Sequence, residues 1–169
     1  MALTTPPRVA HLAAANVANA TQKRSVGLRA TIVALEAFIA TTAISGAIFV
    51  LPTIPAEWLQ RGLITPFTDT TIPALALGVL CGGSALAAMV AVAFRPRLGA
   101  LLAMLSGVIM VGFELVEIVV VGFTPLLYPT QPPAWLQPFY IALGLAVAAL
   151  GARLWKQQTG SWRIRRASR

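Results

Sequence analysis

The chain has 169 residues, enough for one compact unit but too few for a membrane domain joined to a sizeable soluble one. Hydrophobic residues make up 57% of it and charged residues only 11%, against about 25% charged in soluble proteins, which excludes an ordinary soluble fold. The formal net charge is +8, but the basic residues are clustered along the chain, so we expect no nucleic-acid partner.

The first 29 residues are polar and alanine-rich, with four basic residues and no acid. They lack the long apolar segment of a secretory signal, so we expect a disordered cytoplasmic arm over residues 1–29. The only histidine, His11, lies in this arm and is not available to ligate a haem inside a membrane. The only cysteine, Cys81, lies in an apolar run, so we expect no disulfide, metal site or cofactor.

Four apolar runs follow, at residues 30–51, 72–94, 98–123 and 139–154. A helix of about 20 apolar residues crosses a bilayer, and only the last run is clearly shorter than that. The turn at Arg95, Pro96 and Arg97 is tight, so the second and third helices should be antiparallel neighbours. The sequence therefore predicts an all-α, integral membrane four-helix bundle over residues 30–155, followed by a basic cytoplasmic tail at 156–169.

The basic residues indicate the orientation of this bundle. Twelve of the 13 Lys and Arg lie in the arm, in the Arg95–Arg97 turn or at the C-terminal end, and Arg61 alone lies on the opposite side. Lys and Arg accumulate on the cytoplasmic side of membrane proteins, so both termini are expected in the cytoplasm. The same face contains no acid and should contact anionic lipid.

The two outer loops share a sequence pattern. PTIPAEWLQ at residues 52–60 and PTQPPAWLQ at residues 129–137 match at six of nine positions. We interpret this as an internal repeat of two similar helical hairpins related by an axis along the membrane normal, which would place Glu36 and Glu114 at similar depth. The alternative is that Pro and Trp recur because membrane interfaces favour them.

Three acids lie inside the apolar runs. Glu114 and Glu117 are three residues apart and share one helix face, and Glu36 lies within the first run. Carboxyl groups are costly in lipid, so these should face protein or water. They are candidates for binding a proton or a small cation, or for hydrogen bonding between helices.

Small residues and tryptophans complete the candidate set. Gly78 and Gly82 form a GxxxG pattern, and Gly144 and Ala148 form a similar small face on the fourth helix, where backbones can approach closely. Packing within the chain is the expected use, with homo-oligomerisation as the alternative. Three tryptophans are expected to anchor the helix ends at the membrane interfaces, where Trp is enriched: Trp58, Trp135 and Trp155.

Several short stretches resemble a family of small, uncharacterised four-span bacterial membrane proteins with no assigned function: LEAF at residues 35–38, TPFTD at 65–69, IP at 72–73, QPFY at 137–140 and LG at 143–144. The resemblance covers roughly residues 30–154. It implies a four-span fold in a bacterial inner membrane and carries no activity or ligand with it.

Two functional interpretations follow. The first is an accessory or structural membrane component that packs against a membrane-protein partner. The second is a proton- or cation-linked small transporter that uses Glu36, Glu114 and Glu117. No catalytic residues are expected, because these acids have no matching base or metal ligand, and the protein is not expected to be an enzyme.

Overall fold

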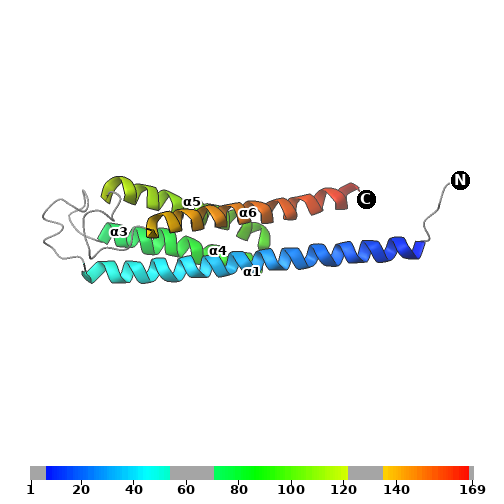
Figure 1. Cartoon of the computed structure of the whole chain (residues 1–169), viewed down its shortest axis with the longest axis horizontal. Coiled ribbons are helices and arrows are strands. Elements are labelled where there is room, and N and C mark those ends of the chain that lie inside the picture. Colours follow the sequence, from blue (N-terminus) through cyan, green and yellow to red (C-terminus); the bar gives the residue numbers. More distant parts are fainter. Residues whose placement is uncertain (1–6, 54–70, 122–134, 168–169) are drawn as a thin grey trace.

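A computed structural model describes residues 7–53, 71–121 and 135–167, and within these ranges the chain is helical throughout, apart from Arg95 and a turn at Trp135. Four rods result (Figure 1). They are α1 (Pro7–Thr53); a continuous second rod of α3 (Thr71–Leu75), the π-helix η1 (Ala76–Gly83) and α4 (Ser84–Phe94); α5 (Pro96–Val121); and α6 (Leu136–Ala167).

Each rod contains a segment long and apolar enough to cross a membrane: Gln22–Phe49, Thr71–Phe94, Pro96–Val119 and Leu136–Thr159. The prediction of an all-α chain with four membrane-length apolar helices is therefore confirmed over the described residues. This architecture is that of a small multi-pass membrane protein.

The helical regions extend beyond the apolar runs at both ends. The sequence favours a disordered arm over residues 1–29, with a weak helix over residues 9–20 as the alternative, but in the structure α1 begins at Pro7 and continues unbroken into the first span. Proline is favoured in the first turn of a helix, and no proline follows until Pro52. Alanine-rich polar sequence has high helix propensity without an apolar face, so hydrophobic periodicity did not reveal it. Helix α6 likewise extends into the basic tail, as far as Ala167.

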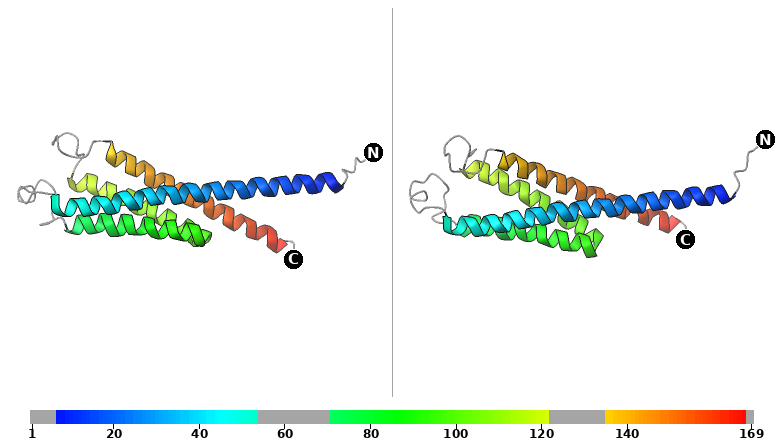
Figure 2. Two further views of the ribbon diagram at one scale, coloured as in Figure 1. Left: turned by 90° about the horizontal axis from the view of Figure 1, so that it is seen from below. Right: turned by 60° about the horizontal axis from the view of Figure 1, so that its bottom comes forward.

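The rods form an antiparallel bundle in which α1 packs against η1 and α4, α4 against α5, and α5 against α6. Helix α6 also crosses α1 obliquely (Figure 2). Near the start of α6, the ring of Phe139 meets that of Phe38 edge to face, with centroids 6.1 Å apart. The α4–α5 turn lies at the same end of the bundle as the N-terminal half of α1 and the C-terminal half of α6 (Figure 1). The predicted antiparallel pairing across Arg95 is confirmed.

Glycine brings α5 and α6 into backbone contact. A Cβ atom on Gly107 would lie 2.4 Å from the carbonyl oxygen of Gly144 and 2.8 Å from the backbone nitrogen of Ala148. Gly151 lies equally close to α5, since a Cβ atom added to it would lie 2.9 Å from the carbonyl oxygen of Ala100. The predicted small face of α6, Gly144 and Ala148, thus packs on α5, although the sequence reading did not include Gly151 in it.

The second small-residue pattern faces α1. A Cβ atom on Gly78 would lie 3.0 Å from the Cβ of Ala47, and one on Gly82 would lie 2.6 Å from the side chain of Ile44. Both glycines belong to η1, so the π-helix forms part of the close contact between the second rod and α1. In the structure, both predicted glycine faces serve contacts within the chain.

The end of α4 is held by a side chain from α1. The Arg29 guanidinium donates hydrogen bonds to the carbonyl oxygen of Val92 at 3.1 and 3.2 Å and to that of Ala93 at 2.6 Å. These carbonyls belong to the last turn of α4, where no further helical N–H group is available and a cation is favoured. Arg29 therefore caps a helix that lies more than 60 residues away along the chain.

Candidate functional site

Glu36 lies at the centre of the bundle, fully enclosed between helices. Its exposed fraction is 0%, and its Oε2 atom accepts a hydrogen bond of 2.9 Å from the Ser106 hydroxyl of α5. Helices α1 and α5 make few other contacts, because they lie across the bundle from each other. This hydrogen bond therefore links two rods that otherwise make little contact with each other.

The second carboxylate oxygen of Glu36, Oε1, is buried and has no hydrogen-bond partner. The sequence places no Lys or Arg in residues 30–51, 72–94 or 98–152, so the membrane-spanning runs offer this carboxyl group no basic partner. An isolated charge is very costly in such surroundings. Neutralisation must come from a proton or from a bound cation.

A second polar group lies farther from the α4–α5 turn, toward the C-terminal end of α5. Glu114 is only 4% exposed, and Glu117 lies one turn further along α5, half-buried. The two carboxyl groups lie near enough for their charged forms to influence each other, and the buried Cys81 of η1 lies within the same range of both. Three rods thus contribute to this cluster when Gln137 of α6 is included.

Gln137 is 6% exposed, and neither its Oε1 nor its Nε2 atom has a hydrogen-bond partner. Its amide lies within interaction range of the Glu117 carboxyl group without meeting hydrogen-bond geometry. The helix register agrees with this placement: Gly144 of α6 contacts Gly107 and Val111, so Gln137, about two turns earlier on the antiparallel α6, is level with Glu114 to Glu117. Gln137 is not among the site residues predicted from the sequence, although a polar Gln next to an apolar run could have indicated it.

The structure does not bring the three acids to one site. Glu36 is level with Ser106, which precedes Glu114 on α5 by eight residues, or about 12 Å along the helix axis. The expectation that Glu36 and Glu114 lie at similar depth is therefore wrong. The outer loops that carry the repeat lie mostly outside the described residues, so the two-hairpin repeat itself stays a prediction.

The π-helix η1 contributes Cys81 to the second polar group. Runs of π-helix are rare and occur frequently at functional sites. Among the described residues, no group of three or more His, Cys, Asp or Glu side chains is placed to hold a metal ion. The carboxyl and amide groups here can hold protons, hydrogen-bond one another or bind a monovalent cation.

The three tryptophans have different surroundings. Trp135 is 59% exposed at the start of α6 and stacks edge to face on Phe139 at 5.9 Å. Trp155 is half-buried and packs against the hydrophobic core, so it also supports the bundle. Trp58 lies outside the described residues.

Comparison with protein-family models, with curated proteins and with solved structures finds no match to this chain. We therefore infer function from the buried side chains and from the packing around them.

Proposed function

We propose that this small multi-pass membrane protein is an accessory or structural component of a bacterial inner membrane, built to pack against a membrane-protein partner. The observation that carries the proposal is the use of Glu36, the most buried carboxyl group among the described residues, as a link between α1 and α5 through Ser106. A hydrogen bond at the bundle centre and backbone contact between α5 and α6 favour a rigid scaffold.

We further propose that both termini lie in the cytoplasm. The arm, the Arg95–Arg97 turn and the tail hold 12 of the 13 basic residues, and the described parts of these three segments lie at one end of the bundle. The positive-inside rule assigns that end to the cytoplasm, where the basic surface would contact anionic lipid. Cysteines introduced at residues 24 and 156 should be protected from a membrane-impermeant maleimide in intact cells and labelled after lysis. Labelling in intact cells would contradict this orientation.

Site-specific photo-crosslinking in native membranes tests the accessory role. Exposed apolar positions on three rods are suitable sites for the crosslinker: Val79, Val108, Val116 and Leu145, each more than half exposed. A scaffold that packs on a partner should give one discrete protein adduct from positions on one face of the bundle and none from the others. Adducts with lipid alone from all four positions would refute the role.

The second candidate is a proton- or cation-linked transporter. The specific observation in its favour is that Glu36 Oε1 and both amide atoms of Gln137 are buried without partners. A rigid scaffold gains nothing from unsatisfied polar atoms, since each costs about 1–3 kcal/mol. A carrier requires such groups, because its cargo satisfies them for part of the cycle.

Flux measurements on reconstituted liposomes distinguish the two candidates. The carrier requires proton or sodium flux that Glu114→Gln abolishes while the helical circular dichroism spectrum is retained. Ser45→Ala, at an exposed hydroxyl on α1, is the control and should leave the flux unchanged. Absence of flux from the wild-type protein, or flux that persists in Glu114→Gln, would eliminate the carrier and leave the accessory role standing.

A further inference from the structure

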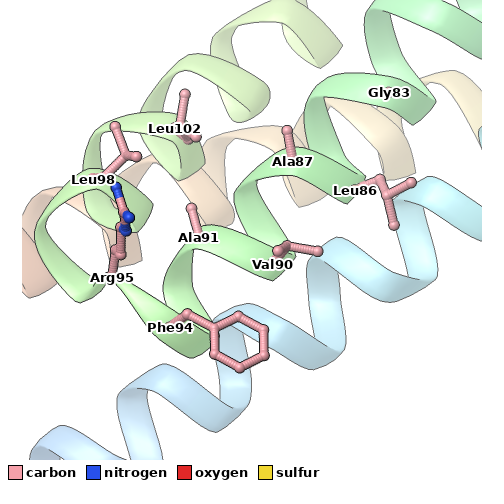
Figure 3. Close-up of a pocket in the computed structure, with 9 residues that line it drawn as sticks. All are labelled: Gly83, Leu86, Ala87, Val90, Ala91, Phe94, Arg95, Leu98 and Leu102. Atoms are coloured by element: carbon pink, nitrogen blue, oxygen red, sulfur yellow. The ribbon is translucent and has the colours of Figure 1, made fainter.

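The face formed by α4 and α5 contains an apolar groove that takes no part in the polar sites described above. It has a volume of about 550 Å³ and is lined by nine residues (Figure 3): Gly83, Leu86, Ala87, Val90, Ala91, Phe94, Arg95, Leu98 and Leu102. Three small residues spaced by four lie along the second rod: Gly83 at the end of η1, and Ala87 and Ala91 on α4. Their side chains are too short to fill the space beside α5, so the groove follows from the sequence.

The groove has one charged end. Arg95 closes it at the α4–α5 turn, and its guanidinium lies beside Leu98 of α5 (Figure 3). The neighbouring Arg29 adds positive charge, although its guanidinium is bound to the carbonyls at the end of α4. The first turn of α5 contains no acidic residue. An occupant of the groove therefore meets an apolar channel that ends at a cation.

The length of the groove matches one membrane leaflet. From Gly83 to Arg95 the chain advances 12 residues, which is about 18 Å along a helix. Half of the hydrocarbon thickness of a bilayer is about 15 Å. A lipid chain beside Ala87 and Ala91 would thus reach from mid-membrane to the interface, where the phosphate group lies near Arg95.

A second copy of this chain fits the groove less well. Two copies related by an axis along the membrane normal would bring both Arg95 side chains to the same depth at the interface between the copies. Like charges at such a position repel each other. The Arg95 guanidinium is instead complementary to a phosphate, which arginine binds through paired hydrogen bonds.

We propose that the α4–α5 groove binds one anionic phospholipid, with an acyl chain along Ala87 and Ala91 and the phosphate on Arg95. This site depends on the membrane-spanning bundle alone and goes beyond both functions proposed above. A failure of the site would leave those functions untouched.

Native mass spectrometry of the full chain in detergent tests the site, with phosphatidylglycerol and phosphatidylcholine of identical acyl chains as probes. The wild-type protein should retain one phosphatidylglycerol at a concentration about tenfold lower than it needs for phosphatidylcholine. Both lipids carry a phosphate, but only phosphatidylcholine also carries a cation, which is repelled by Arg95. Arg95→Gln should remove this preference. The matched control Lys156→Gln, at an exposed cation on α6, should keep it.

Filling the groove provides the second variant. Ala87 is exposed, so Ala87→Leu occupies the groove without entering the core, and it should weaken binding of both lipids. Ala142→Leu, at an exposed alanine on α6, is its control and should bind as the wild type does. Equal binding of the two lipids by the wild type, an unchanged preference in Arg95→Gln, or retention of lipid by Ala87→Leu would overturn the proposal. A dimer or a bound protein that Ala87→Leu releases would also overturn it, since the occupant would then be a helix.

Discussion

The contact between α5 and α6 makes a sharp prediction at Gly107. Alanine at this position would place its Cβ atom 2.4 Å from the carbonyl oxygen of Gly144, about 1 Å closer than the 3.4 Å at which ordinary van der Waals contact begins. The second obstacle, the backbone nitrogen of Ala148, is 2.8 Å away. Both obstacles are backbone atoms, so no rotamer change can relieve the clash. The two helices must move apart.

Overpacking of this kind costs about 1–3 kcal/mol. Gly112 on the same helix is the matched control, because a Cβ atom there would meet nothing within 4 Å. Both substitutions gain the same helix propensity, up to about 1 kcal/mol. The difference in unfolding free energy between Gly107→Ala and Gly112→Ala therefore isolates the cost of the helix contact.

The assay is unfolding in mixed detergent micelles with increasing dodecyl sulfate, followed by far-UV circular dichroism. We expect Gly112→Ala to match or exceed the wild type and Gly107→Ala to unfold at lower denaturant. Gly144→Ala, whose Cβ would lie 2.8 Å from the carbonyl oxygen of Gly107, should behave like Gly107→Ala. The double variant Gly107→Ala/Gly144→Ala should lose less unfolding free energy than the sum of the losses in the two single variants, because one separation of the helices relieves both clashes. Equal stability of Gly107→Ala and Gly112→Ala would refute the close approach.

Three further predictions concern single side chains. Ser106→Ala should destabilise the bundle by about 1 kcal/mol in the same assay, because it leaves the Glu36 carboxyl group buried without a partner. Adding Glu36→Leu should recover part of the loss, because it removes that carboxyl group. A double variant less stable than Ser106→Ala would argue against a packing role for this pair. Arg29→Gln should cost about 1 kcal/mol through loss of the α4 cap, whereas Arg24→Gln, exposed on the same helix, should cost nothing; equal effects would show that the cap does not matter. Cys81 is 1% exposed, so maleimide should label it at least about tenfold more slowly in the folded protein than in dodecyl sulfate, and equal rates would contradict its burial.

Helix α1 shows how far the sequence predicts local structure. The apolar run at residues 30–51 identifies the first span, because the length of an apolar segment is a local property. The preceding arm has helix-forming residues, which allow a weak helix over residues 9–20, but it has no long apolar segment to show that the helix is continuous with the first span. Burial of Glu36 could be expected from its apolar neighbours. Its partner could not, because Ser106 lies 70 residues further along the chain.

The sequence alone determined that this is a four-rod helical chain of membrane length, with its basic residues clustered at the ends and at one turn, because hydropathy and charge are read along the chain. The tertiary structure decided which groups meet: Glu36 with Ser106, the Gln137 amide beside Glu117, and Gly107 on Gly144. These contacts depend on the depth of each helix in the bundle and on its rotation relative to the neighbouring helix. Depth and rotation are set by the packing of small residues between helices, and that packing places Glu36 two turns away from the acids it was expected to join.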